Sequence, residues 1–236
     1  MRKVLTVVGV AACLWIASPD AQAAPILRLS HTGFAVLDVA DGSGMDADAA
    51  ANIIEFDGPY GTFEFTFLGG ASNSPGSTVG TLEIGTFRAK NISNTAQTLT
   101  VWLTDTNFNA PGLVGDVLSL TSSVGSASVM ANSSVVFESF VDAGNVAFAE
   151  TLATGAVTCV PGPSCSGDTT VYFARPLLYS LTNQTDLTVA AGQTLSFDGL
   201  TTSAVPEPGS MLLFGTGLMG LAGAARRRMR NRGSQQ

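Results

Sequence analysis

The sequence predicts an all-β fold, an antiparallel β-sandwich, on three observations. The central part of the chain contains short runs in which apolar and polar residues alternate, which is the pattern of strands with one buried face. Residues 63–67 place three phenylalanines on one face, and residues 99–103 alternate likewise, with Trp102 on the otherwise polar face. Turn residues separate the runs at intervals of roughly 8–12 residues, as in sandwiches and barrels. Because each strand has one apolar face, a second sheet must cover it.

Further runs complete the predicted set of strands. They are residues 26–30, 34–39, 52–56, 81–89, 117–120, 134–141, 146–152, 170–180, 187–189 and 194–197. Turn signals such as residues 57–59, 74–76 and 142–145 lie between them, and the Ala-rich residues 46–51 could form one helical turn. We expect a single domain over residues 24–204, because an all-β domain of this size need not be divided.

The predicted domain is poor in charge and strongly acidic. Only 12% of all residues are charged, against about 25% in an average soluble domain. Between residues 24 and 205 four basic residues stand against sixteen acidic ones, which gives a formal charge of −12. Such a surface repels phosphate backbones, so the charge excludes nucleic acid as a partner.

The first 23 residues have the layout of a secretory signal peptide. Arg2 and Lys3 form a positive start, and an uncharged apolar stretch follows. The small residues Ala21 and Ala23 then bracket a cleavage site for signal peptidase before Ala24. Two alternatives stay open: an uncleaved membrane anchor, and a lipoprotein in which Cys13 carries the lipid.

The other end of the chain predicts a transmembrane helix. Residues 209–225 are 17 residues without a charge. As a helix they span about 26 Å at 1.5 Å per residue, slightly less than a hydrocarbon core of roughly 30 Å. Five arginines follow, and the positive-inside rule keeps them cytoplasmic and places the β domain across the membrane. The alternative, a buried helix of a soluble protein, would contain Gly215, Gly217, Gly220 and Gly223, and glycines weaken an isolated helix.

A Pro-Glu-Pro sequence, residues 206–208, precedes the apolar stretch. The order of Pro-Glu-Pro, short apolar helix and arginine cluster resembles the PEP-CTERM sorting signal, here over residues 205–232, with a tail at residues 233–236. The two prolines fix φ and remove hydrogen-bond donors, which keeps the segment extended and separate from the fold. An ordinary proline-rich linker to a membrane anchor stays open as the alternative.

The resemblance implies a route and a partner. Proteins of this family are exported by bacteria that make extracellular polysaccharide, and the membrane protease exosortase processes them. The chain is then expected to be anchored transiently in the inner membrane and delivered to the cell surface or extracellular matrix. The residues implied in sorting and processing are Val205, Pro206, Glu207, Pro208, Arg226, Arg227 and Arg228.

Cys159 and Cys165 predict a disulfide-closed loop, because two cysteines this close in an exported protein usually pair. A loop of this length contributes roughly 2 kcal/mol by the chain-entropy estimate. A redox pair or a metal site is the competing interpretation, but it lacks the two-residue spacing and a nearby histidine.

Four aspartates, Asp38, Asp41, Asp46 and Asp48, cluster in a Gly-containing segment. Carboxylate oxygens in such a segment could hold calcium, which would be the protein's one cofactor. Their spacing does not match an EF-hand loop, and Asp and Gly also favour turns for their own backbone reasons. A solvated hairpin loop is therefore the alternative.

The sequence does not predict an enzyme. His31 is the one histidine, no Gly-x-Ser-x-Gly motif is present, and no pair of carboxylates indicates glycoside hydrolysis. We expect a non-enzymatic surface or matrix protein associated with exopolysaccharide. The alternatives are an adhesin or carbohydrate-binding module, with calcium or aromatic contacts, and a secreted hydrolase. The candidate stacking residues are Tyr60, Trp102, Phe108, Tyr172 and Tyr179, although aromatic residues of strands usually fill the core.

Overall fold

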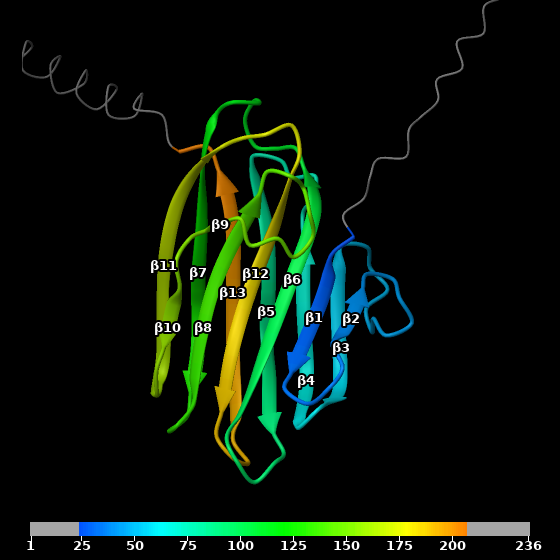
Figure 1. Cartoon of the computed structure of the whole chain (residues 1–236), viewed down its shortest axis with the longest axis vertical. Helices are drawn as coiled ribbons and strands as arrows, with labels where there is room; N and C mark the ends of the chain where they lie inside the picture. Colours follow the sequence, from blue (N-terminus) through cyan, green and yellow to red (C-terminus); the bar gives the residue numbers. More distant parts are fainter. Residues whose placement is uncertain (1–23, 207–236) are drawn as a thin grey trace, which may run out of the picture.

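Two antiparallel sheets pack face to face in the computed structural model, which describes residues 24–206 (Figure 1). Sheet A has the order β10 (Val157–Cys159), β8 (Ser134–Asp142), β12 (Tyr179–Val189), β6 (Gln97–Phe108), β1 (Ile26–His31) and β2 (Leu37–Ala40), and β9 (Leu152–Ala153) also pairs with β8. Sheet B has the order β11 (Gly162–Ala174), β7 (Val117–Val129), β13 (Thr194–Ala204), β5 (Val79–Asn91), β4 (Phe63–Ser72) and β3 (Ile53–Tyr60). This architecture confirms the predicted all-β fold of paired antiparallel sheets.

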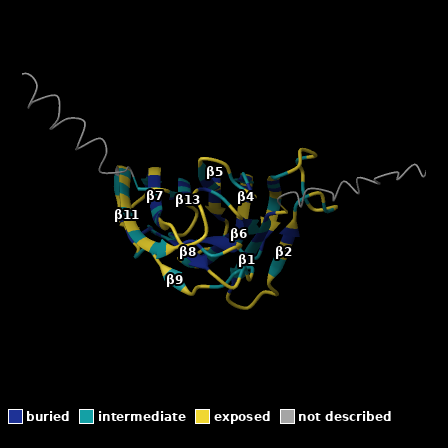
Figure 2. Cartoon of the chain, turned by 90° about the horizontal axis from the view of Figure 1, so that it is seen from above, coloured by how far each residue is buried: buried dark blue, intermediate teal, exposed yellow. Residues whose placement is uncertain are grey.

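The core lies between the two sheets, where Figure 2 shows the buried residues gathered. Strand alternation builds it: Leu99, Val101 and Leu103 of β6 are fully buried. Trp102 lies between them in sequence and is only partly buried, because its side chain is on the opposite face of the strand. The alternating pattern therefore predicted correctly both the inward face of β6 and the outward position of Trp102.

The pattern fails at Phe67, which was expected on the buried face with Phe63 and Phe65. Phe67 is 44% exposed and has a positive φ of 56°. Its backbone N–H donates to Asp57 Oδ1 at 2.6 Å, and Leu68 takes the buried position instead. A local irregularity in β4 has therefore reversed the face on which the third phenylalanine lies.

Three other segments differ from the expected elements. Residues 146–152 lie mostly in the loop after β8 rather than in a strand. The expected strand over residues 170–180 is divided between β11 and β12, because Pro176 lacks an N–H and the Arg175 N–H donates to the Asp116 carbonyl in another loop. Residues 46–51 form bends and turns without a helix.

Both predicted membrane-related segments, the signal peptide and the C-terminal helix, lie outside the described residues. Within residues 24–206 no helix is both long and apolar enough to span a membrane. The last strand, β13, ends at Ala204, and only Val205 separates it from the Pro-Glu-Pro sequence.

Candidate functional site

One row of side chains crosses the outer face of sheet A. Backbone pairing places Arg28 of β1 opposite Asp38 of β2 and Trp102 of β6. It places Gln184 of β12 opposite Trp102 and also opposite Glu138 of β8. Opposite residues of neighbouring strands point to the same side of a sheet, so five consecutive strands contribute one side chain each. The row combines an aromatic ring, an amide, a guanidinium and two carboxylates.

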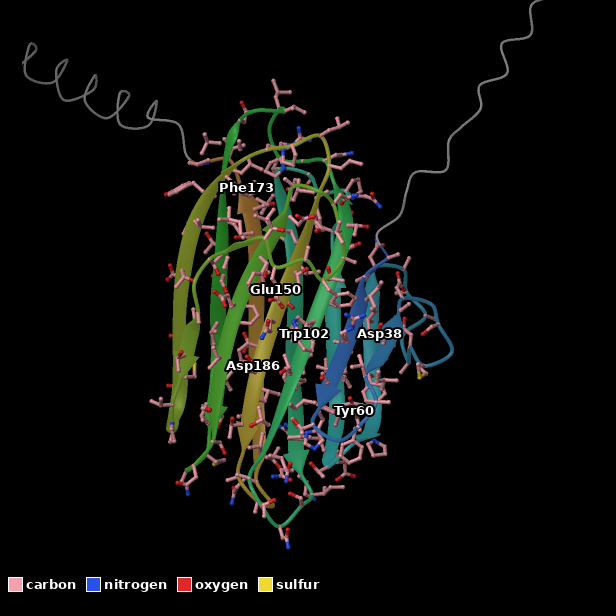
Figure 3. All side chains as sticks on the ribbon, viewed as in Figure 1. Asp38, Tyr60, Trp102, Glu150, Phe173 and Asp186 are labelled. Carbon is pink, nitrogen blue, oxygen red and sulfur yellow. A yellow bond between two sulfur atoms is a disulfide. The ribbon has the colours of Figure 1, made fainter. Side chains whose placement is uncertain are left out.

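The row opens into a groove of about 590 Å³ at its β1–β6 part. The residues that line the groove are Arg28, Ser30, Val36, Asp38, Trp102, Phe148 and Glu150. Five of them come from β1, β2, β6 and the segment between β1 and β2, while Phe148 and Glu150 come from the loop after β8. Figure 3 shows Trp102 with Glu150, Asp186 and Asp38 around it.

Trp102 is held in place through its indole nitrogen. Nε1–H lies within hydrogen-bond distance of Gln184 Oε1, at 3.1 Å, and of Glu150 Oε1, at 3.3 Å. Gln184 in turn donates from Nε2 to Asp186 Oδ2 at 3.0 Å, and the Thr100 hydroxyl donates to Asp186 Oδ1 at 2.6 Å. This chain of hydrogen bonds fixes the orientation of the ring on the outer face.

Arg28 forms the cationic side of the groove, but its charge is neutralised. Its guanidinium donates to Asp38 twice, from Nε to Oδ1 at 2.7 Å and from Nη2 to Oδ2 at 2.8 Å. The same group lies 3.8 Å from the ring centroid of Phe148, a cation–π contact. The hydrogen bonds from Arg28 lower the pKa of Asp38 despite partial burial. Asp38 is therefore an anion at neutral pH with its oxygens engaged.

The loop of residues 143–151 brings Phe148 and Glu150 to the groove, and Asp142 holds it. Asp142 Oδ1 accepts the Thr151 hydroxyl at 2.7 Å, and Oδ2 accepts the Val146 N–H at 3.0 Å. The Thr151 hydroxyl, and then the Val146 N–H, lower the pKa of Asp142. The carboxylate thus joins the first half of the loop, at Val146, to its last residue, Thr151.

Contacts with sheet A fix the rest of this loop. Asn107 and Asn145 form a reciprocal pair, in which the Asn145 side chain donates to Asn107 Oδ1 at 2.9 Å and accepts the Asn107 N–H at 2.7 Å. The Phe148 N–H donates to Thr104 Oγ1 at 3.1 Å. Asn107, Asn145 and Phe148 all have positive φ, at 67°, 59° and 60°. Asparagine tolerates this conformation, whereas in Phe148 the surrounding contacts maintain it.

Comparison with known families decides what the C-terminal end is. Residues 204–228 match the family model of the PEP-CTERM protein-sorting motif. The chain carries a PEP-CTERM sorting motif. The motif indicates an exported protein that exosortase sorts to the cell surface, and it confirms the resemblance seen in the sequence. Val205 and Pro206 are its last described residues, and Glu207, Pro208 and the arginines Arg226, Arg227 and Arg228 lie outside the described part.

The sandwich itself has only weak similarity to solved structures, and no curated protein matches the sequence. TmCBM61, solved with β-1,4-galactotriose, is 8% identical over 61% of this chain and 90% of that chain, with a TM-score of 0.32. The enzymatically active domain of bacteriophage CBA120 tailspike protein 4 is 12% identical over 67% of this chain and 20% of that chain, with a TM-score of 0.33. TmCBM27, a mannan-recognising carbohydrate-binding module, is 8% identical over 65% and 88%, with a TM-score of 0.25. Similarities this low transfer no ligand or activity.

The four aspartates of the predicted calcium site accept hydrogen bonds from other groups of the chain. Asp38 pairs with Arg28, as described above. Asp41 Oδ2 accepts the N–H of Asn52 at 2.8 Å, Asp46 Oδ1 accepts that of Glu55 at 2.9 Å, and Asp48 Oδ1 accepts that of Ala50 at 2.6 Å. These carboxylates support the loop backbone, which is the alternative that the sequence left open. Over residues 24–206 no group of three or more His, Cys, Asp or Glu side chains is arranged to hold a metal ion.

Cys159 and Cys165 form the predicted disulfide, with an S–S distance of 2.05 Å. Cys159 belongs to β10 of sheet A and Cys165 to β11 of sheet B, so the bond links the edges of the two sheets. The two strands that the disulfide joins do not line the groove.

The remaining aromatic candidates and His31 lie outside the groove, and all of them except Tyr172 are buried in the core. Tyr60 donates its hydroxyl to the carbonyls of Leu29 and Ala35, at 3.0 and 2.8 Å, and Phe108 stacks on Tyr179 inside the core. His31 is buried and bonded through Nδ1 to the Thr98 carbonyl at 2.9 Å, away from the groove residues. Tyr172 is 61% exposed on β11 of the other sheet. Of the proposed stacking residues, Trp102 alone lies in the groove.

Proposed function

We propose that the chain is an exported, non-enzymatic protein of the cell surface or extracellular matrix, which exosortase processes at its sorting motif. The match at residues 204–228 carries this proposal. Signal peptidase would remove the first 23 residues, and residues 209–225 would anchor the chain transiently in the inner membrane. The Pro-Glu-Pro sequence follows the end of β13, so cleavage there would leave the strand pairings of β13 intact.

The end of the sandwich at which the sorting motif begins carries exposed apolar side chains. They support an orientation in which this end faces the membrane before processing. Leu113 and Val114 before β7 are 75% and 59% exposed, and Leu177 before β12 is 72% exposed. The two loops are joined by hydrogen bonds, from the Gly115 N–H to the Arg175 carbonyl at 2.9 Å and back from the Arg175 N–H to Asp116 at 2.8 Å. Both lie at the end where β13 finishes (Figure 1). An apolar end suits a surface that faces a membrane before processing.

The prolines of the motif test the sorting proposal. Replacing Pro206 and Pro208 together by Ala should make a longer, membrane-retained species accumulate, because exosortase would no longer recognise the segment. Immunoblots of membrane and extracellular fractions measure this. The control replaces the exposed Pro59 and Pro161 by Ala, which leaves the motif intact. Unchanged size and location of the motif variant would contradict processing at this site.

The groove favours a second function, binding of a neutral polysaccharide. A fixed indole ring presents an apolar surface to the C–H groups of a sugar ring, and nearby carboxylate and amide groups can bind sugar hydroxyls. The cation of the groove is already paired, through Arg28 and Asp38. A domain with a formal charge of −12 also repels acidic polymers. These observations support a neutral glycan, the exopolysaccharide of the host being the first candidate.

The lowered pKa of Asp38 makes this groove residue unsuited to the acid role in glycoside hydrolysis. A glycosidase needs one carboxyl group that remains protonated near its working pH, which requires a raised pKa. Arg28 instead lowers the pKa of Asp38. The ion pair also occupies both oxygens of this carboxylate.

The chain provides its own probe for this binding. Its two tryptophans are Trp15 and Trp102, and Trp15 would leave with the signal peptide. Trp102 would then be the one fluorescent indole, located in the groove itself. Titration of the processed protein with the purified host polysaccharide, and with neutral and uronic-acid oligosaccharides, should change the emission only for neutral sugars. Absence of any change with all sugars would contradict the binding proposal and leave the sorting proposal untouched.

A further inference from the structure

A buried carboxylate lies beside the first described residue. Asp105 of β6 is 2% exposed, and its Oδ2 is buried without a hydrogen-bond partner. Its Oδ1 accepts the Thr106 N–H at 2.7 Å and the Ala24 N–H at 3.4 Å. No cation balances this charge among the described residues, where the two ion pairs are Arg28–Asp38 and Lys90–Glu64. A buried carboxylate that is ionised and has no cation partner strongly destabilises a fold.

Backbone hydrogen bonds hold the residues that follow Ala24 in place beside this carboxylate. The Asp41 N–H donates to the Pro25 carbonyl at 3.1 Å, and Ile26 pairs with both Thr104 of β6 and Ala40 of β2. The nitrogen of Ala24 therefore has a defined place next to Asp105, although Ala24 itself is exposed.

The electrostatic surroundings of Asp105 oppose its ionisation. Burial raises the pKa of Asp105, and the nearby Asp41 carboxylate raises it further. The Ser72 side chain and the backbone N–H groups of Thr106 and Ala24 act in the opposite direction, without overcoming burial. The position is therefore one that an added positive charge would stabilise.

We propose that Asp105 is the binding site for the α-ammonium group that signal peptidase creates at Ala24. Hydrolysis of the Ala23–Ala24 bond adds one water: Ala23 leaves with a new carboxylate, and the Ala24 nitrogen becomes an amine that takes up a proton. An α-amino group has a pKa of about 7.7–8.0, so it is a cation at neutral pH. It offers three donors where the peptide offered one, enough to serve Oδ1 and approach Oδ2. The inference rests on the proposed export, in particular on cleavage before Ala24.

Processing then stabilises the domain that it releases. In the precursor, the raised pKa of Asp105 means that stability falls as the pH rises through and above the ordinary carboxyl value of about 3.9. In the processed protein the ammonium group compensates this charge, and the pair raises the pKa of the ammonium. The ammonium should therefore contribute fully below the ordinary α-amino range of about 7.7–8.0, and its contribution should be lost as the pH rises from there through its raised pKa.

The test compares chains that differ only at the new N-terminus. The full-length gene is expressed with its own signal peptide, with or without Gly-Ser inserted between Ala23 and Ala24, each in the Asp105 and Asp105→Asn backgrounds. We expect the insertion to lower the melting temperature at pH 6 by roughly 2–4 °C in the Asp105 background. In the Asn background the insertion should have no such effect. An equal drop in both backgrounds, or none in either, overturns the ion pair.

A second measurement does not depend on stability. Reductive ¹³C-methylation labels the α-amine and keeps its charge, so its NMR titration gives the pKa directly. We expect a value above the ordinary range in the native protein and a return to that range in Asp105→Asn. An ordinary value in both overturns the proposal. Mass spectrometry of the same samples gives the first residue: a start other than Ala24 overturns the ion pair but leaves export, which the Pro206 and Pro208 variant tests separately.

Discussion

The outer faces of the two sheets use the same backbone pattern for different purposes. On sheet B, backbone pairing aligns four threonines in one row across four strands. They are Thr170 of β11, Thr121 of β7, Thr202 of β13 and Thr81 of β5. On sheet A the corresponding row contains charged and amide side chains around Trp102. Threonine and tryptophan both favour strands, but a large aromatic side chain on an outer face leaves apolar surface that is usually buried.

The difference arises mainly from one loop. Residues 143–151 lie over sheet A, where the Ser180 hydroxyl donates to the Val146 carbonyl at 2.7 Å and Phe148 contacts Arg28. This loop turns part of a flat sheet surface into a groove. Alternation thus decides which side chains of a strand face outward, while the overlying loop makes that outward face one wall of a groove.

The largest effect is expected at Trp102. Trp102→Ala removes the stacking surface and should weaken neutral-glycan binding by about thirtyfold, which corresponds to roughly 2 kcal/mol for an aromatic residue that dominates an interface. Isothermal titration with the host polysaccharide measures this. The matched control is Tyr172→Ala, an exposed aromatic residue of sheet B, which should leave the affinity unchanged. Equal losses in the two variants would show that binding is not localised to sheet A.

A smaller effect is expected when the loop is loosened without touching the groove. Asp142→Asn weakens the hydrogen bonds to Thr151 and Val146, which should cost about 1.5–3 kcal/mol of unfolding free energy and weaken the glycan affinity by about fivefold. Urea denaturation and calorimetric titration give the two values. The control is Asp116→Asn: this carboxylate accepts the Leu113 N–H at 2.7 Å in a different loop, so its loss should not change the affinity. Full affinity in Asp142→Asn would mean that the loop is not needed.

The sequence predicted local features of this surface well. Regular alternation was enough to place Leu99, Val101 and Leu103 inside and Trp102 outside, because side-chain direction in a strand depends only on the period of two. The sequence also showed a turn at Asp142–Asn145. It did not show that the following residues fold back over the sheet, and it predicted a strand there.

The assembly of the groove could not be predicted for a physical reason. Gln184 lies 82 residues from Trp102 along the chain, and Glu150 lies 48 residues from it. Such contacts depend on which strands are neighbours, and strand order is not encoded in the period of any one strand. Asp105 illustrates the same limit. It was counted only as one acidic residue of sixteen, and its burial beside Ala24 follows from the pairing of β1 with β6.

Glycan binding at the groove of sheet A should depend modestly on pH. Asp38 and Asp142 both have a pKa lowered by their partners, so the groove is stabilised above the ordinary aspartate value of about 3.9 and loses this as the pH falls through the lowered values. Glycan affinity should therefore be constant from about pH 8 to 4 and decrease by about twofold only as the pH falls below the ordinary aspartate value of about 3.9. Titrations across this range measure it, and Asp142→Asn should show a flatter profile. An affinity that already changes between pH 7 and 5 would point to groups other than these two.

The smallest effect is expected in the threonine row. Thr121→Val removes the hydroxyl contact with Thr170 Oγ1 at 2.9 Å but keeps the branched shape that strands prefer. Unfolding free energy should change by no more than about 0.5 kcal/mol, as for most surface substitutions, and glycan affinity should not change at all. Denaturation and titration of the same sample measure both. If this substitution weakened binding as much as Trp102→Ala does, the polysaccharide would be bound by sheet B, and the loop over sheet A would have only a structural role.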